Sequence, residues 1–120
     1  MKYDIIIVGA GPGGYVAAIK AAQHGAKVAL IEKEALGGVC LNIGCIPTKA
    51  LIKSAKVKRL LDNSEKYGIG VNKDSVRTDW GKVIQRKDEI VKRLTGGVEM
   101  LLKKNSVDVI RGEAKFKDNE

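Results

Sequence analysis

The fold can be inferred from the stretch Ile5-Ile6-Ile7-Val8-Gly9-Ala10-Gly11-Pro12-Gly13-Gly14. A run of β-branched residues that ends at glycine is typical of a short buried strand. The glycines fit the pattern G-x-G-x-x-G, which indicates dinucleotide binding when it joins a strand to a helix. Residues 15–23 are rich in alanine and precede His24-Gly25, which suits the end of a helix, and residues 27–31 form a second apolar run. The stretch therefore opens a βαβ unit with two parallel strands.

The glycines of this turn have separate physical roles. Gly9 makes the tight turn, Gly11 lets the backbone approach a pyrophosphate, and Gly14 lets helix and strand pack closely. With Gly13 they form the candidate pyrophosphate-binding residues, at a helix start whose free N–H groups favour anions. Glu32 ends the second strand, 18 residues after Gly14, where a carboxylate can bind a ribose diol and disfavours NADP. The alternative is a structural glycine turn followed by a surface glutamate.

The rest of the chain predicts two long helices and a third strand. In order, we expect an irregular segment (36–44), a helix (47–66), a loop (67–76), a helix to residue 105, a strand (106–110) and the start of another strand (113–117). The second helix should be capped by Thr78 or Asp79 and interrupted by a kink or close contact at Gly96-Gly97. We therefore expect one domain of the α/β class, a Rossmann-like unit with a parallel three-stranded sheet core and helices on both faces.

The chain has two cysteines, Cys40 and Cys45. In a regular helix, residues five apart differ by about 7.5 Å in height and about 140° in rotation. A disulfide needs Cα atoms about 4.4–6.8 Å apart, so this pair can form one only where the helix is broken. Gly44 and Pro47 favour such a break, and we predict an intramolecular bridge. The alternatives are two unpaired thiols or a zinc site, although zinc needs about four ligands and only His24 could join the cysteines.

The position of the cysteines favours FAD as the cofactor. Cys40 lies eight residues after Glu32. That length spans about 26 Å when extended, enough to run from an adenosine ribose to the redox-active end of a dinucleotide. A dithiol makes chemical sense there opposite a flavin, which can exchange an electron pair with a thiolate. Lys49 follows Cys45 by one helical turn and could stabilise a thiolate or a reduced flavin; the alternative is a solvated lysine.

The net charge of +8 is concentrated in the middle of the chain, because residues 49–104 contain 15 Lys or Arg and 7 Asp or Glu. A basic segment can bind nucleic acid, but solvated helix faces explain the charge and no nucleic-acid motif is present, so we expect no nucleic-acid partner.

No apolar run approaches the roughly 18 residues of a membrane span, and no secretory signal is seen. We expect a cytoplasmic protein without a membrane partner. In that compartment a disulfide is more often catalytic or redox-sensing than structural.

A family resemblance is carried by the stretch Gly37-Gly38-Val39-Cys40-Leu41-Asn42-Ile43-Gly44-Cys45-Ile46-Pro47-Thr48-Lys49-Ala50-Leu51. It resembles the redox-active disulfide signature of the class I flavoprotein disulfide reductases, the pyridine nucleotide-disulfide oxidoreductases. The end of this stretch and the later Leu94-Thr95-Gly96-Gly97-Val98 are most similar to the lipoamide branch, with the glutathione and mercuric reductases as close alternatives. The resemblance covers the whole chain.

The resemblance implies a role for each candidate site residue. Cys40 would be the interchange thiol that reacts with lipoamide sulfur, and Cys45 would be the charge-transfer thiol beside the flavin. FAD would lie with its pyrophosphate over the glycine turn. Further cofactor contacts would come from Glu32, Lys33, Gly38, Val39, Cys40, Lys49 near the flavin ring, and Ala114 at the adenine end. No metal is implied. Electrons would pass from dihydrolipoamide to the disulfide, then to FAD, then to NAD.

The resemblance also sets an expectation about domains. This chain resembles only the N-terminal part of an FAD-binding domain, without the NAD, central and dimer-interface domains. We therefore expect the 120 residues alone not to turn over. The complete protein would be a homodimer that serves lipoyl groups of a 2-oxo acid dehydrogenase complex; a freestanding flavin-binding redox module is the alternative. Two residues depart from the family pattern: Val39 replaces the usual threonine, so one hydroxyl contact to the cofactor would be lost, and Thr48 replaces serine.

Overall fold

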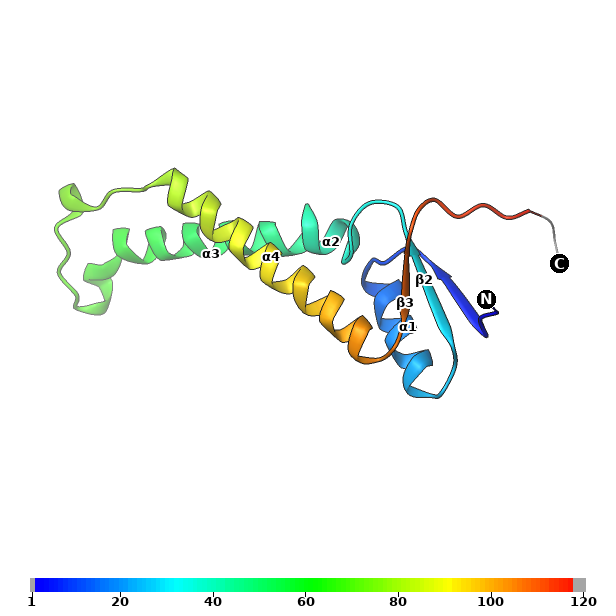
Figure 1. The fold of residues 1–120 in the computed structure, drawn as a ribbon. Coiled ribbons are helices and arrows are strands. Elements are labelled where there is room, and N and C mark those ends of the chain that lie inside the picture. The colour runs from blue at the N-terminus through cyan, green and yellow to red at the C-terminus, as the bar shows by residue number, and fades with distance from the viewer. Residues whose placement is uncertain (1, 118–120) are drawn as a thin grey trace.

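The computed structural model describes residues 2–117, and three parallel strands form its sheet. β1 (Ile5–Val8), β2 (Val28–Glu32) and β3 (Asp108–Arg111) lie in the order β1-β2-β3 (Figure 1). Valine and isoleucine dominate the first two strands because their branched side chains pack well on a pleated surface. The predicted sheet of three parallel strands is confirmed.

Two helices cover one face of this sheet. α1 (Pro12–Gln23) links β1 to β2, and α4 (Trp80–Lys104) leads into β3. These helices contact each other as well as the strands. Both crossovers move in the same direction across the sheet, and crossovers between parallel strands are right-handed, so their helices lie on the same side. The α/β class is confirmed, but in residues 2–117 the helices lie on one face and not on the predicted two.

The strand register explains the character of the two faces. Ile7, Leu30 and Val109 are paired across the sheet; Leu30 belongs to the buried hydrophobic core, and Ile7 and Val109 are partly buried against it. The next row includes Val8 and Ile110, which are 62% and 42% exposed. Successive strand residues point to opposite faces, so one face is covered and the other carries exposed apolar side chains.

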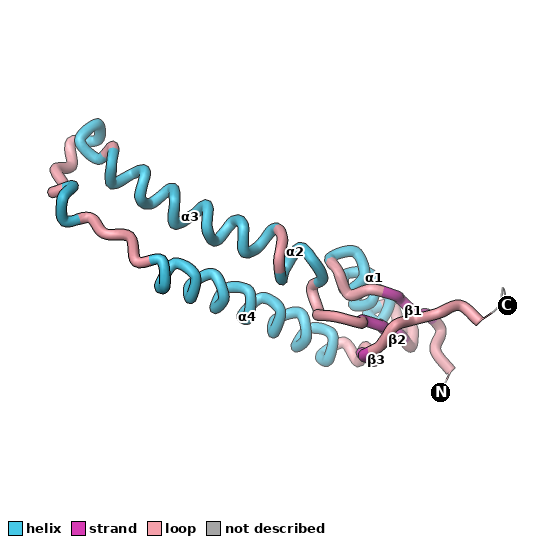
Figure 2. Tube along the Cα trace, turned by 90° about the horizontal axis from the view of Figure 1, so that it is seen from above, coloured by secondary structure: helices cyan, strands magenta, loops and turns pink. Residues whose placement is uncertain are grey.

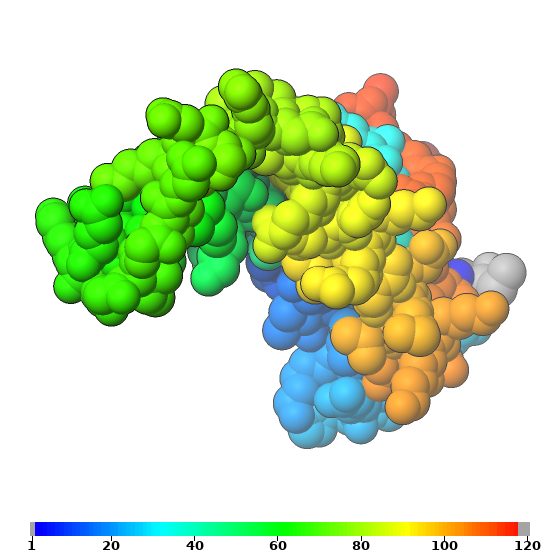
Figure 3. Space-filling view, turned by 90° about the vertical axis from the view of Figure 1, so that its left-hand side faces the viewer, coloured from blue at the N-terminus to red at the C-terminus, as the bar shows by residue number. Residues whose placement is uncertain are grey.

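The second crossover is a long helical arm. It is formed by α2 (Gly38–Asn42), α3 (Cys45–Asp62), the short 3-10 helices η1 (Ser64–Tyr67) and η2 (Lys73–Ser75), and the returning α4. α3 and α4 pack along each other, and the molecule is 67 Å long but only 26 by 21 Å across (Figure 2). Figure 3 shows the green tip of the arm standing clear of the rest of the molecule. Among residues 2–117, no helix is both long enough and apolar enough to cross a bilayer.

Residues 36–44 were predicted to be irregular, and the structure corrects this. They contain α2, which begins after Gly37 in the left-handed conformation. The side-chain amide of Asn42 donates to the carbonyl oxygens of Leu36 and Gly38, at 3.0 and 2.8 Å, and so closes this short helix. A glycine-rich segment is therefore helical here because a side chain satisfies its carbonyl groups.

Two other predicted boundaries are also wrong. α3 begins at Cys45 and ends at Asp62, where the Asn63 side chain donates to the Arg59 carbonyl oxygen at 2.8 Å. Residues 113–117 form no strand, because the backbone leaves the sheet after Gly112 donates to the Glu32 carbonyl oxygen.

α4 runs without a break through Gly96-Gly97, where a kink or a close contact was predicted. A Cβ on either glycine would meet nothing within 4 Å, so no close approach requires them. Val98 and Leu102 are buried just beyond, and this packing outweighs the low helix propensity of glycine. The predicted cap is confirmed: an Asp79 carboxylate oxygen accepts the Lys82 N–H at 3.1 Å.

Candidate functional site

The turn after β1 brings α1 very close to the strand. Gly9 has φ of +93°, which favours glycine, and its N–H donates to the Ile31 carbonyl oxygen at 2.8 Å. A Cβ on Gly14 would lie 1.8 Å from the Gly9 carbonyl oxygen, and no side chain can occupy that position. The close helix–strand contact that the glycine spacing predicts is therefore present.

The outer side of the same turn is open. A Cβ on Gly11 or Gly13 would meet nothing within 4 Å. Gly11 precedes α1, and no side chain caps the free N–H groups of the first helical turn. Pro12 follows at the first helical position, where its lack of an N–H costs little. This open helix start has the space and the donors that a phosphate group needs.

The Glu32 carboxylate lies against this turn. One of its oxygens accepts the Ala10 N–H and the other accepts the Glu34 N–H, both at 2.7 Å. The side chain is buried. These two hydrogen bonds, that from Ala10 first, hold the pKa of Glu32 below its ordinary value. The site therefore contains a buried negative charge beside the start of α1, and each carboxylate oxygen still has a lone pair for a hydroxyl donor.

A second glycine pair packs onto the turn and places α2 beside it. The Gly37 N–H donates to the Ala10 carbonyl oxygen at 2.8 Å. Gly38 has φ of +58°, and a Cβ there would lie 2.8 Å from the Gly11 Cα. The chain can approach the turn this closely only with glycine at that position. Cys40 follows only two residues after Gly38, the residue that contacts the turn.

Cys40 and Cys45 form a disulfide with a Cα–Cα distance of 4.7 Å. α2 ends at Asn42 and α3 starts at Cys45, so the helix is broken between the two cysteines, as their spacing required. A Cβ on Gly44 would lie 2.9 Å from the Val39 carbonyl oxygen, which explains glycine at the break. The predicted bridge is present in the structure.

The other candidate residues are exposed or half-buried. Val39 is 67% exposed and Lys49, one turn beyond Cys45, is also exposed. Lys33 is exposed next to Glu32, and Ala114 is half-buried in the segment after β3. Hydrogen bonds and close backbone contacts bring Gly11, Glu32 and Gly38 together, and the Lys33 backbone N–H contributes to the lowered pKa of Glu32. Among residues 2–117, these contacts do not link Lys49 or Ala114 to the centre.

Sequence reasoning missed two residues that build the site. Ala10 is fully buried; its N–H binds Glu32 and its carbonyl oxygen accepts from Gly37. Asn42 closes α2 through its side-chain amide. Asn42 had a detectable signal, since it lies between the two cysteines, but nothing about an alanine within a glycine turn indicates its two partners. Within residues 2–117, no three side chains of His, Cys, Asp or Glu gather where they could share a metal ion.

This fold and this site define a class of protein. A βαβ unit presents an open glycine turn and a buried carboxylate, and α2, which carries one cysteine of a disulfide, begins with a glycine that contacts this turn. Residues 3–120 match the pyridine nucleotide-disulphide oxidoreductase family, and the chain belongs to that family.

Curated relatives and a solved structure agree with this assignment. The chain is 61% identical to dihydrolipoyl dehydrogenase of Acholeplasma laidlawii over 92% of its own length and 33% of that protein. It is 53% identical to dihydrolipoyl dehydrogenase of Staphylococcus aureus over 99% of its own length and 25% of that protein. The Cu(II) complex of RclA, an HOCl-induced flavoprotein disulfide reductase from Escherichia coli, superposes with a TM-score of 0.74 at 36% identity. That match covers 95% of this chain and 23% of RclA.

The chain thus spans about a quarter to a third of the length of the curated relatives that it matches.

Proposed function

We propose that this chain is the FAD-binding, disulfide-bearing part of an NAD-dependent dihydrolipoyl dehydrogenase. The observation that carries the proposal is the contact of Gly38 with Gly11, which places the start of α2, two residues before Cys40 of the disulfide, beside an open glycine turn. Identities of 46% to 61% to dihydrolipoyl dehydrogenases, against 36% to RclA, favour the lipoamide branch of the family.

The residues present fit FAD. The open space over Gly11 and the uncapped start of α1 suit its pyrophosphate, with Gly9, Gly13 and Gly14 shaping the turn. The ionised Glu32 suits a ribose diol. Further contacts would come from Lys33, Gly38, Val39, Cys40, Lys49 and Ala114. FAD, when bound, would supply a two-electron carrier between the dithiol and NAD.

The disulfide would carry out the chemistry with substrate. A dihydrolipoyl thiolate would attack the Cys40 sulfur, break the bond to Cys45 and release Cys45 as a thiolate. The second lipoyl thiolate would then displace Cys40 and form the lipoyl disulfide. Two electrons pass to the cysteine pair, and the two thiol protons pass to solvent or to a base. Lys49, one turn beyond Cys45, would stabilise the thiolate.

The same relatives suggest the partners. We propose that the complete protein acts on lipoyl groups of a 2-oxo acid dehydrogenase complex and works as a homodimer. The cytoplasmic location stays a prediction.

The cofactor part of the proposal is tested by FAD titration of the chain, followed by flavin fluorescence. Gly11→Val should weaken FAD binding by about tenfold or more, because the side chain fills space that the pyrophosphate needs. Gly70→Val is the matched control, since a Cβ on Gly70 also meets nothing within 4 Å. An equal effect of both substitutions, or none of the first, would contradict the proposed site.

The disulfide part is tested by intact mass after alkylation. Chain purified in air should take up no alkyl group without reductant and two with reductant, because both cysteines are in the bridge. Two alkyl groups added without reductant would contradict the proposal.

A further inference from the structure

The tip of the arm contains a basic pocket that the redox site does not use. The pocket has a volume of about 360 Å³ and is lined by Lys56, Arg59, Leu60, Asn63, Lys66 and Tyr67. We call these six residues the tip pocket. They come from the last turns of α3, from Asn63 just after it and from η1, at the end of the arm away from the sheet (Figure 1). Three of the six are cations and none is acidic.

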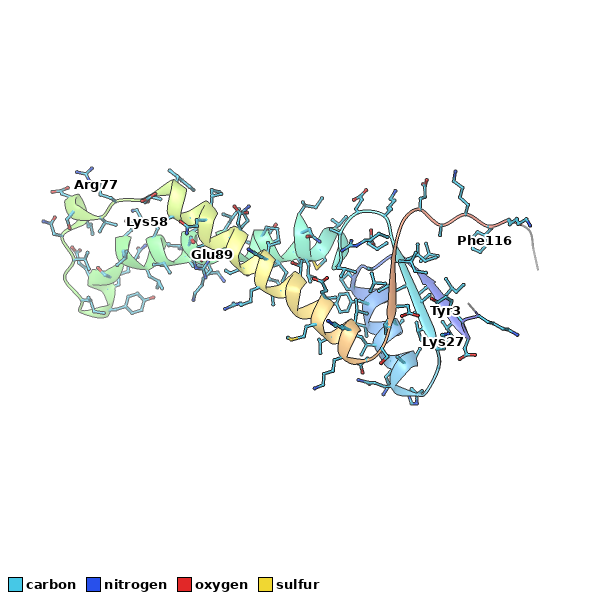
Figure 4. The ribbon with its side chains drawn as sticks, in the orientation of Figure 1. Tyr3, Lys27, Lys58, Arg77, Glu89 and Phe116 are labelled. Carbon is cyan, nitrogen blue, oxygen red and sulfur yellow. A yellow bond between two sulfur atoms is a disulfide. The ribbon has the colours of Figure 1, made fainter. Side chains whose placement is uncertain are left out.

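The cations of the tip pocket are free of acidic partners within residues 2–117, since no carboxylate lies within 4.0 Å of Lys56, Arg59 or Lys66. The two acids nearest in sequence are paired elsewhere: Asp62 with Lys58, and Glu65 with Lys73. Lys58, labelled in Figure 4, lies on α3 within the arm. The positive charge of the pocket is therefore left for a ligand.

The tip pocket also exposes apolar surface. Leu60 is 56% exposed and Tyr67 is 68% exposed, and both line the same hollow as the cations. A solvated helix face does not need an aromatic ring and a leucine beside its charges. The combination fits a ligand that brings carboxylates together with one apolar or aromatic side chain.

We propose that the tip pocket binds an acidic peptide segment of a partner protein. The Arg59 guanidinium can bind a carboxylate through two hydrogen bonds, and Lys56 and Lys66 provide two further point charges in the same pocket. Leu60 and Tyr67 take the apolar side chain of the peptide.

A nucleic acid fits this surface less well than a peptide. Asp62 and Glu65 are next in sequence to pocket residues, and Asp74, Asp79 and Asp88 belong to the returning part of the arm, in η2 and at the start of α4. A phosphate backbone that followed the arm would meet these carboxylates, whereas a short peptide would touch only the pocket. The interaction does not depend on the redox chemistry of the disulfide.

The test is fluorescence anisotropy with a fluorescein-labelled oligoglutamate peptide that carries a central phenylalanine. The chain should bind it saturably, and the double variant Lys56→Gln/Arg59→Gln should weaken binding by about tenfold or more. The matched control is Lys53→Gln/Lys103→Gln, which also removes two helix cations that have no acidic partner within residues 2–117, but from outside the tip pocket. This control should change binding by no more than about twofold.

Other outcomes overturn the proposal. If the two double variants lost the same amount of peptide affinity, the peptide would be attracted only by the net charge of the chain. Tighter binding of a single-stranded RNA than of the peptide, or full competition by inorganic phosphate at low concentration, would assign the pocket to a phosphate ligand. Absence of saturable peptide binding, with the variants and the chain giving the same circular dichroism spectrum, would show that the pocket binds no acidic segment.

Discussion

Glu32 shows how one side chain serves both the fold and the site. Its position at the end of β2 predicted a contact with a ribose. The structure adds that its carboxylate joins the end of β2 to the turn after β1, because it accepts the Ala10 and Glu34 N–H groups. Only the ionised form offers both oxygens as full acceptors, so the charge that suits a cofactor also stabilises the turn.

Glu32→Gln should therefore destabilise the chain by about 1–3 kcal/mol at neutral pH, since a buried N–H loses its acceptor. The pKa of Glu32 is lowered in the folded chain from its ordinary value of 4.5. The stabilisation is thus complete above that value and is lost as the pH falls through the lower, folded pKa. Urea unfolding at neutral pH measures the loss of stability in the variant, and urea unfolding below pH 4.5 measures how much of the Glu32 stabilisation is lost in acid.

The control for this prediction is Glu34→Gln, which removes an exposed carboxylate two residues away. It should leave the acid dependence of the unfolding free energy close to that of the unchanged chain. If Glu32→Gln retained the full loss of stability in acid, the assigned role of the Glu32 charge would be wrong.

At the scale of elements, two neighbouring glycines at the start of α1 look alike in the sequence but have different surroundings in the structure. Gly14 lies against the Gly9 carbonyl group, and Gly13 lies in the open. The first sets the distance between helix and strand. The second leaves the helix start free for a ligand.

Gly14→Ala should destabilise the chain by about 3 kcal/mol, because the new methyl group must displace α1 from the turn. Gly13→Ala is the matched control and should stabilise the helix by about 0.5–1 kcal/mol, since its methyl group meets nothing. Urea unfolding followed by circular dichroism compares them. Equal effects of the two substitutions would contradict the helix–strand distance described above.

The molecule as a whole is held together by α4, which belongs to both the arm and the core. Its first half packs along α3, and its last turns reach the sheet, where Leu102 is fully buried and Val98 is nearly so. The arm is long and thin and contributes few buried residues of its own. Stability is therefore expected to depend on the end of α4 that lies on the sheet.

Leu102→Ala should lower the free energy of unfolding by about 2–5 kcal/mol, as expected for a leucine removed from a packed core. Leu101→Ala, one residue earlier and 47% exposed, should cost less than about 1 kcal/mol. The midpoints of urea unfolding give the comparison. A cost for Leu101→Ala as large as that for Leu102→Ala would place the core on a different side of α4.

Much of the fold and part of the site could be predicted from local pattern. The run from Ile5 to Gly14 predicts strand, turn and helix because its signals lie within ten consecutive residues. The broken helix between Cys40 and Cys45 follows from the geometry of a disulfide alone. The helix in residues 36–44 could not be predicted in this way, since its glycines argue against it and the Asn42 side chain supplies the missing hydrogen bonds.

The amino-acid order was thus enough to predict the kinds of elements, the parallel strands and the glycine turn, and to favour a bridge between the cysteines over unpaired thiols or zinc, because each prediction rests on residues close together in the sequence. Three features emerged only from folding: both helices on one face, the Glu32–Ala10 bond, and the approach of Gly38 to Gly11. The bond joins residues 22 positions apart and the approach joins residues 27 positions apart. Such contacts follow from how the elements pack, because they join residues that are far apart in the sequence.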